Sequence, residues 1–363
     1  MLKKTSYLVL LGLLYFALSA MATNAFMQRW GFRELPGVAF SFQRMLDGSA
    51  RRPWAYRVLV PQTVNAVASA CPQALEIRLQ AYLLKDSGVK DRYFRGADAD
   101  WTLDYALRYH IAYGLVFLSL FTTLWLLRSL PAKFGIRNPW LNDLAPLAFA
   151  TLLPLAYLNG GYLYDYPELI FLAGSFVLIH SRAWALPLLI PLATLNKETA
   201  LLIPILLLPV VATQPVDTRR RALAALGIAF VAGTVTYLIV QWLHRANTGG
   251  LAEPHLALNA RYWIDPRNYL FGFSSIFAAG LPTAKPLNIV VLGSVITLGV
   301  SSWRRVSVTI RRMLIVALAV NVPLVLALSY QDELRNLSLS FMPIYVYFVA
   351  AASLRKTPDG VAA

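Results

Sequence analysis

A lysine and a glutamate stand side by side in the most apolar part of this chain. Between Ala183 and Thr213, Lys197 and Glu198 are the only charged residues. Ionisable groups near membrane depth are costly unless they pair or line a polar cavity. The two residues therefore indicate either a simple ion pair that caps a hairpin or a functional site. In the functional interpretation, Lys197 is a candidate phosphate ligand and Glu198 is a candidate catalytic acid.

A second polar cluster occupies residues 42–61, FQRMLDGSARRPWAYRVLVP, which contain one aspartate and four arginines. Asp-Gly followed by Arg-Arg-Pro is typical of a turn that presents its side chains. A carboxylate can act as a general base, and guanidinium groups bind phosphate in a bidentate manner. Asp47 is therefore a catalytic candidate, Arg57 a phosphate ligand, and Arg51 and Arg52 are supporting residues. The alternative is a plain turn whose arginines touch anionic headgroups.

The segment 160–171, GGYLYDYPELIF, places an aspartate among three tyrosines at the start of an expected helix. Aromatic residues around a carboxylate are typical of sugar sites and equally of the interfacial belt of membrane proteins. Asp165 is therefore a catalytic candidate and Tyr164 a supporting residue. The alternative for Asp165 is a helix cap before Pro167.

The segment 331–336, QDELRN, places charges between two apolar runs. Its simplest interpretation is an internal salt bridge between Glu333 and Arg335. In the functional alternative, Glu333 supports Arg335, which is directed at a phosphate.

Other chemistries lack their sequence signatures. His244 and His255 do not have a recognised metal-ligand spacing, and Cys71 is the only cysteine. No metal site or other cofactor is predicted, although a divalent metal remains an open alternative. The P-loop and the motifs G-x-S-x-G and H-E-x-x-H are absent, so nothing supports an ATP-driven pump, an esterase or a zinc protease.

Composition shows which elements must position these residues. The chain has 363 residues, of which 58% are hydrophobic and 14% are charged, and its mean hydropathy is +0.55. This composition indicates a polytopic transmembrane protein of the all-α class, with about ten helices in one integral domain, 1–363. The apolar runs are 6–24, 106–127, 143–160, 167–181, 183–195, 199–213, 222–243, 286–303, 313–330 and 337–354. A cleaved signal peptide ending near Ala20-Met21-Ala22 is the alternative for the first run.

The distribution of the formal charge of +15 argues against a nucleic-acid partner. Alternating the runs across a membrane collects 15 of the 33 basic residues and three acidic residues on one side, which gives that side +12 and the other +3. Basic residues in short loops mark the cytoplasmic side, so both termini are expected there. The basic residues of that side are Lys3, Lys4, Arg128, Lys133, Arg137, Arg182, Arg219, Arg220, Arg221, Arg304, Arg305, Arg311, Arg312, Arg355 and Lys356.

The polar candidates then fall on one face of the membrane. The predicted external loops are 25–105, 161–166, 196–198, 244–285 and 331–336, with an interfacial helix near 56–70 followed by an exposed loop at 85–101. As one helix, residues 183–213 would be roughly 46 Å long, against a hydrocarbon core of about 30 Å. Two short helices with their apex at 196–198 are therefore expected, with the apex in a polar recess.

The chain resembles the GT-C superfamily of integral-membrane glycosyltransferases, which use lipid-phosphate-linked sugars. The resemblance lies in the order of four short motifs on one side of the membrane: Asp47-Gly48, Tyr56–Pro61, Lys197-Glu198 and Glu333-Leu334-Arg335. It implies a compact bacterial enzyme in which Asp47 and Asp165 occupy the places of the superfamily's catalytic acids. The absence of an acidic pair just after the first helix and of a soluble C-terminal domain departs from the superfamily pattern.

The expected function is sugar transfer from a polyprenyl-phosphate donor to a glycan, lipid or protein acceptor, at the outer face of a bacterial cytoplasmic membrane. By this resemblance, Arg57, Lys197 and Arg335 would stabilise the departing phosphate, and Asp47 would deprotonate the acceptor. The expected partners are this donor, the acceptor and membrane lipids, and the oligomeric state stays open. A transporter or flippase of lipid-linked or phosphorylated sugars is the main alternative, and a polysaccharide polymerase or assembly component is another.

Overall fold

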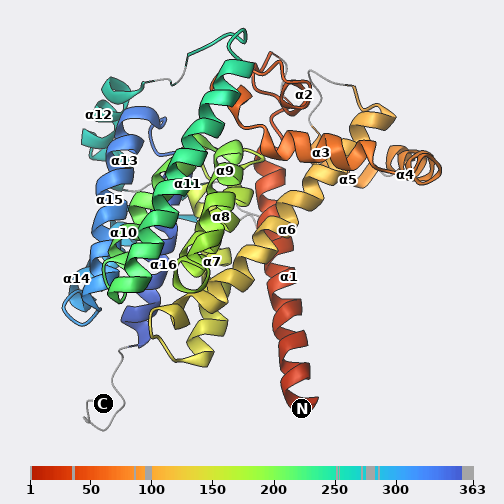
Figure 1. Ribbon diagram of the computed structural model, residues 1–363. Helices are drawn as coiled ribbons and strands as arrows, with labels where there is room; N and C mark the ends of the chain where they lie inside the picture. Colours follow the sequence, from red (N-terminus) through yellow and green to blue (C-terminus); the bar gives the residue numbers. More distant parts are fainter. Residues whose placement is uncertain are drawn as a thin grey trace.

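Helices dominate the architecture of the computed structural model (Figure 1). The structure describes residues 2–34, 37–85, 87–94, 100–250, 252, 254–270, 273–274, 283–284 and 287–353. In this part of the chain, the one sheet is a two-stranded antiparallel ribbon that pairs β1 (Phe273–Ser274) with β2 (Thr283–Ala284). The predicted all-α class is therefore confirmed.

Each of the ten apolar runs overlaps a helix in the described part of the chain. These helices are α1 (Leu2–Trp30), α6 (Leu103–Lys133), α7 (Pro139–Ala156), α8 (Asp165–Ser181), α9 (Leu186–Asn196), α10 (Ile203–Val211), α11 (Val216–Leu243), α14 (Ile289–Ser302), α15 (Val308–Leu328) and α16 (Ser338–Ser353). Among the described residues, five helices are long and apolar enough to cross a membrane: Thr5–Trp30, Leu103–Lys133, Val216–Leu243, Val308–Leu328 and Leu334–Ser353. The chain is thus a multi-pass helical membrane protein.

The shorter helices gather mainly in the two long loops. They are α2 (Phe42–Leu46), α3 (Leu59–Ser69), α4 (Gln73–Lys85), α5 (Ser87–Tyr93), α12 (Leu256–Ile264) and α13 (Arg267–Leu270). Single 3-10 turns occupy Trp54–Tyr56 (η1), Ala183–Ala185 (η2), Glu198–Leu202 (η3) and Leu334–Leu337 (η4). Helices α2 and α3 and the α12 region lie at the end of the bundle opposite the two chain termini (Figure 1).

The structure places α3 within the expected interfacial segment but corrects the loop predicted at 85–101. Residues 87–93 form α5, because Tyr93 is buried against the rest of the bundle. The ring of Tyr93 stacks on Tyr113 of α6 at 5.8 Å, and its hydroxyl donates to Asn24 of α1 at 2.6 Å. These apolar and polar contacts order a segment whose composition resembles a loop. Residues 95–99 lie outside the described residues.

Helices α9 and α10 form the predicted hairpin. At its tip, the side-chain amide of Asn196 donates to the carbonyl of Tyr164, just before α8, at 3.0 Å. At its open end, Gln214 donates to the carbonyl of Ile179, in the last turn of α8, at 3.1 Å. The chain therefore runs along α8 toward its first residue in α9 and returns toward its last turn in α10. Lys197 breaks the helix at the tip with extended backbone angles (φ −161°, ψ 131°).

Helix α1 is packed into the bundle and supports the loop before α8. Trp30 donates from its indole nitrogen to the carbonyl of Tyr157 at 2.7 Å, and Arg33 donates to the carbonyl of Gly161 at 3.1 Å. A methyl group at Gly161 would lie 2.5 Å from the Trp30 ring, so only glycine fits. At the other end of α1, the Tyr15 hydroxyl donates to the carbonyl of Asp143 at 2.9 Å.

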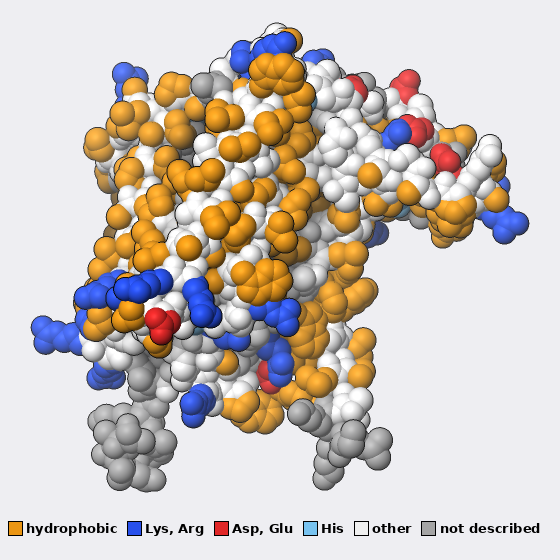
Figure 2. Space-filling model, in the orientation of Figure 1, with side chains coloured by type: hydrophobic (Ala, Val, Ile, Leu, Met, Phe, Trp, Pro, Cys, Tyr) orange, Lys and Arg blue, Asp and Glu red, His pale blue; other side chains and the backbone are white. Residues whose placement is uncertain are grey.

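The surface follows the predicted charge asymmetry. Hydrophobic side chains cover the sides of the bundle, and Lys and Arg side chains gather near the end that carries the termini (Figure 2). Apolar sides with a basic rim are typical of a protein seated in a bilayer.

Candidate functional site

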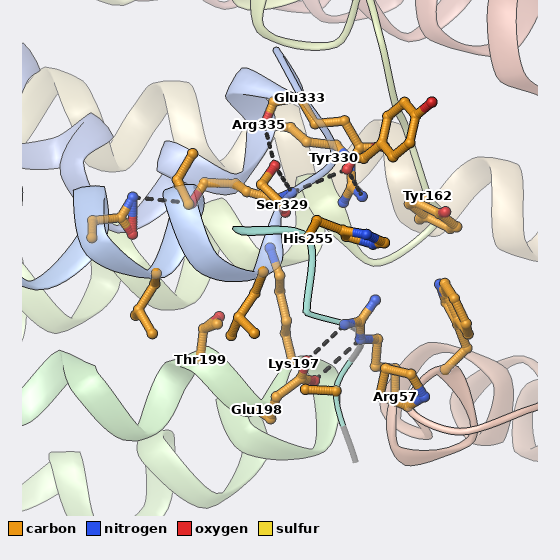
Figure 3. A pocket seen from close by; sticks show the side chains of 18 of the residues that line it. Arg57, Tyr162, Lys197, Glu198, Thr199, His255, Ser329, Tyr330, Glu333 and Arg335 are labelled. Carbon is orange, nitrogen blue, oxygen red and sulfur yellow. Dashed lines mark hydrogen bonds and ion pairs between the residues drawn. The ribbon is translucent and has the colours of Figure 1, made fainter. Parts of the chain in front are cut away.

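A cavity of about 470 Å³ opens at the loop end of the bundle (Figure 3). All five predicted external loops contribute to its wall, although up to about 300 residues separate them in the sequence. The cavity is lined by Phe40, Pro53, Trp54, Arg57, Tyr162, Lys197, Glu198, Thr199, Ala252, His255, Asn321, Leu324, Val325, Leu328, Ser329, Tyr330, Glu333, Arg335 and Asn336. Five of the predicted site residues therefore line one pocket: Arg57, Lys197, Glu198, Glu333 and Arg335.

Arg57 and Glu198 form a bidentate ion pair on this wall. Nε and Nη2 of Arg57 donate to the two carboxylate oxygens of Glu198 at 3.1 and 2.7 Å. Nη1 of Arg57 donates to the hydroxyl of Tyr164, whose ring centroid lies 4.4 Å from the guanidinium carbon. Arg57 follows η1 directly, and Glu198 begins η3, so the pair joins the first loop to the hairpin tip.

Burial and charge act in opposite directions on this pair. Burial by itself raises the pKa of Glu198, but Arg57, a backbone hydrogen bond and Lys197 together lower that pKa by more, so it lies below its ordinary value. Burial likewise lowers the pKa of Arg57, and Glu198 and Tyr164 together raise it by more. Both side chains are therefore charged at neutral pH, and Glu198 is a weak base while it is paired.

Lys197 pairs with Glu168 rather than with its neighbour Glu198. The ammonium of Lys197 donates to a Glu168 oxygen at 2.8 Å, and both side chains are buried. The other Glu168 oxygen accepts hydrogen bonds from Ser338 at 2.8 Å and from Thr199 at 3.3 Å. Glu168 thus ties the hairpin tip to α8 and α16. Glu168 was not among the predicted site residues. Its sequence signal is its place one helical turn after Asp165.

Arg335 lies between two carboxylates. Its Nη1 donates to Asp165 at 3.2 Å and its Nη2 to Glu333 at 3.1 Å, while its guanidinium carbon lies 4.4 Å from the Tyr162 ring centroid. Asp165 also accepts the backbone N–H of Tyr162 at 2.8 Å. Asp165 is buried behind the cavity wall and does not line it, so its observed role is to hold Arg335.

Aromatic rings form the side of the cavity nearest the first loop. Phe40 stacks on Trp54 with ring centroids 4.3 Å apart, and Tyr162 stacks on Tyr164 at 5.3 Å. Figure 3 shows Tyr162 and His255 directed toward the same space as Arg57. Flat apolar rings beside charged groups can contact a ligand that has both an apolar face and a charged group.

Asp47 does not line the cavity. Its exposed carboxylate accepts the backbone N–H of Ser49 at 2.9 Å and the Ser49 hydroxyl at 2.6 Å, an Asp turn at the end of α2. Arg51 is also exposed. Arg52 donates its backbone N–H to Thr248 at 2.8 Å, where the first and fourth external loops meet. These residues shape the loop beside the cavity.

The predicted fourth external loop lines one side of the cavity with Ala252 and His255, and it is anchored by a residue that sequence reasoning missed. Asn259 is fully buried and donates to the carbonyls of Leu326 and Ser329 at 2.9 and 2.6 Å. Its side-chain oxygen accepts the backbone N–H of Gln331 at 2.7 Å. Asn259 therefore satisfies the C-terminal carbonyl groups of α15. No periodicity or spacing in the sequence marks it.

The charged network contains three cations and four carboxylates, Asp165, Glu168, Glu198 and Glu333, so its formal charge is −1. In the described part of the chain, no three His, Cys, Asp or Glu residues lie together in a way that could hold a metal ion.

Comparisons with protein-family models, with curated proteins and with solved structures find no match to this chain. The fold and the site by themselves define a multi-pass helical membrane protein with a charged, aromatic-lined pocket at one end. Its function has to be argued from that pocket.

Proposed function

We propose that this protein is a membrane glycosyltransferase that uses a polyprenyl-phosphate-linked sugar. The observation that supports the proposal is the pocket itself, where Arg57, Lys197 and Arg335 lie beside aromatic rings at the end of an apolar bundle. A polyprenyl phosphate needs an apolar environment for its tail and cations for its head. Guanidinium groups suit the head because their planar fork binds phosphate oxygens in pairs.

The carboxylates supply the remaining chemistry. Glu198 lines the pocket and is the candidate base for the acceptor hydroxyl. Asp165 and Glu333 orient Arg335, which would stabilise the charge that develops on the leaving phosphate. The acceptor is a glycan, lipid or protein with a free hydroxyl group.

The proposal includes ten spans and two cytoplasmic termini in a bacterial inner membrane, so that the pocket faces outward. Besides the five long helices, the apolar segments Ala183–Asn196, Glu198–Val211 and Ile289–Ser302 have 14 residues each. Such a helix is about 21 Å long, against a hydrocarbon core of about 30 Å. The tip at Lys197 would therefore lie below the headgroups, where a lipid-borne phosphate can reach it.

Sugar transfer by the full-length protein in liposomes tests the proposal. Wild type should transfer sugar from a polyprenyl-phosphate donor, and Glu198→Gln and Arg57→Gln should each reduce transfer by about 100-fold or more. Asp265→Asn is the matched control, because Asp265 also pairs with an arginine but does not line the pocket. Full activity of correctly folded Glu198→Gln and Arg57→Gln would refute this site. Movement of the lipid-linked sugar across the bilayer without transfer would instead indicate a flippase.

A further inference from the structure

We propose that the Glu198 carboxylate lies where the donor phosphate binds, and that the incoming phosphate replaces Glu198 as the partner of Arg57. This inference rests on the proposed function and deepens it, because it names the cation that receives the phosphate and the group that must leave. The ligand is a phosphate ester on an apolar tail.

Arg57 is the cation best suited to exchange its partner. Lys197 is held by Glu168, which lies outside the pocket lining. Arg335 has two carboxylates and keeps Asp165 even when Glu333 turns away. Among the described residues, the recorded partners of Arg57 are Glu198 and the neutral hydroxyl of Tyr164. A second anion can therefore compete for Arg57 against a single carboxylate.

The exposure of the four acidic side chains also favours Glu198 as the group that the phosphate replaces. The Glu198 side chain is 24% exposed, whereas the Asp165, Glu168 and Glu333 side chains are 1%, 7% and 13% exposed. Both Arg57 and Glu198 line the cavity, so an anion in the cavity meets the pair directly. Of the four acids in this network, Glu198 has the most room to move.

The geometry of the pair matches that of the proposed ligand. Two Glu198 oxygens accept from two nitrogens of one guanidinium, at 3.1 and 2.7 Å. Two oxygens of a phosphate group accept in the same arrangement. The Tyr164 hydroxyl and the ring beneath the guanidinium hold Arg57 in place while the partner changes.

The exchange also changes Glu198. While it is paired, the positive charge of Arg57 keeps its pKa low. A half-buried carboxylate that loses its cation gains proton affinity. Donor binding would thus convert a weak base into a stronger one at the moment when the acceptor needs deprotonation.

Equilibrium binding to the full-length protein in detergent tests the exchange. The probes are a polyprenyl monophosphate, the corresponding polyprenyl alcohol and inorganic phosphate. Wild type should bind the lipid phosphate at least about tenfold more tightly than the alcohol. Inorganic phosphate should bind at least about 100-fold more weakly than the lipid phosphate. Glu198→Gln and Glu198→Ala remove the competing carboxylate, so each should bind the lipid phosphate about tenfold more tightly than wild type, while Arg57→Gln should lose the preference over the alcohol.

Asp265→Asn is the control, because it removes a carboxylate that also pairs with an arginine but does not line the pocket. Its affinity should change less than about threefold. Unchanged or weaker binding by both Glu198 variants, with wild-type elution and cooperative thermal unfolding, would overturn the exchange and leave the proposed function standing. If neither wild type nor the Glu198 variants prefer the lipid phosphate to the alcohol, the proposed donor class fails as well. Equal affinity for inorganic phosphate and the lipid phosphate would overturn the assignment to a lipid-borne head.

Discussion

Lys197 and Glu168 form a buried ion pair with a nitrogen–oxygen distance of 2.8 Å, although 29 residues separate them. Through Ser338, the same carboxylate reaches the first turn of α16. The Glu168 carboxylate therefore joins α8, the hairpin tip and α16, which are far apart in the sequence.

The first prediction concerns the stability of this pair. Lys197→Met leaves Glu168 buried without its cation, and Glu168→Gln leaves Lys197 buried without its anion. Each should lower the free energy of unfolding by about 3–5 kcal/mol. The double variant should lose clearly less than the sum of the two losses. Denaturant unfolding in detergent micelles measures all four proteins, and strictly additive losses would show that the two residues are not coupled.

The second prediction concerns Gly160, which lies against the Arg335 cluster. A methyl group at Gly160 would come within 2.6 Å of a Glu333 oxygen and 2.8 Å of Arg335 Nε. Gly160→Ala should therefore displace Arg335, lower the midpoint of thermal unfolding and reduce sugar transfer at least about tenfold. Gly227→Ala in α11 is the matched control, because nothing lies within 4 Å of its added methyl group. Equal behaviour of the two variants would contradict a packed cluster.

The third prediction follows from the lowered pKa of Glu198. Arg57 lowers it most, Lys197 lowers it further, and Tyr164 and Tyr237 lie nearby. Because the folded-state pKa lies below the ordinary 4.5, the pair's stabilisation is complete above that pH and is lost as pH falls through the folded value. The difference in unfolding midpoint between wild type and Glu198→Gln should shrink below about pH 4. A difference that stays constant from about pH 7 to about pH 3 would argue against the charged pair.

The fourth prediction separates Asp47 from the pocket. Asparagine can accept the same hydrogen bonds from Ser49, so Asp47→Asn should keep the turn and transfer sugar within about twofold of wild type. Glu198→Gln, measured in parallel, should lose transfer. Loss of transfer in correctly folded Asp47→Asn would restore Asp47 as the base that the family resemblance implies.

The fifth prediction uses Cys71, the single cysteine of the chain, which is free and half-buried just after α3. A membrane-impermeant maleimide should label it from the outer face of right-side-out vesicles. In a Cys71→Ser background, Thr218→Cys at the exposed start of α11 should label only after the membrane is permeabilised. Labelling with the opposite sidedness would invert the proposed topology.

The pocket contains features that the sequence predicted and others that it did not. The charged residues Lys197 and Glu198, in the middle of an apolar run too long for one span, predicted a hairpin with its tip at these residues. The structure contains this hairpin. The sequence did not predict that Lys197 and Glu198 pair with different partners. The sequence also did not predict that Asp47 lies outside the cavity wall, where hydrogen bonds from Ser49 satisfy its carboxylate.

The sequence by itself determined the long apolar helices and the hairpin turn, because apolar run length acts locally along the chain. It did not determine α5, whose order depends on the contacts of Tyr93 with α1 and α6. The tertiary structure decided which acid meets which base. Arg57 pairs with Glu198 across 141 residues and Arg335 with Asp165 across 170. Such pairing depends on how the helices pack, so the spacing of residues along the chain does not predict it. Gly160, Glu168 and Asn259 matter for the same reason, since each acts through contacts that only the folded bundle creates.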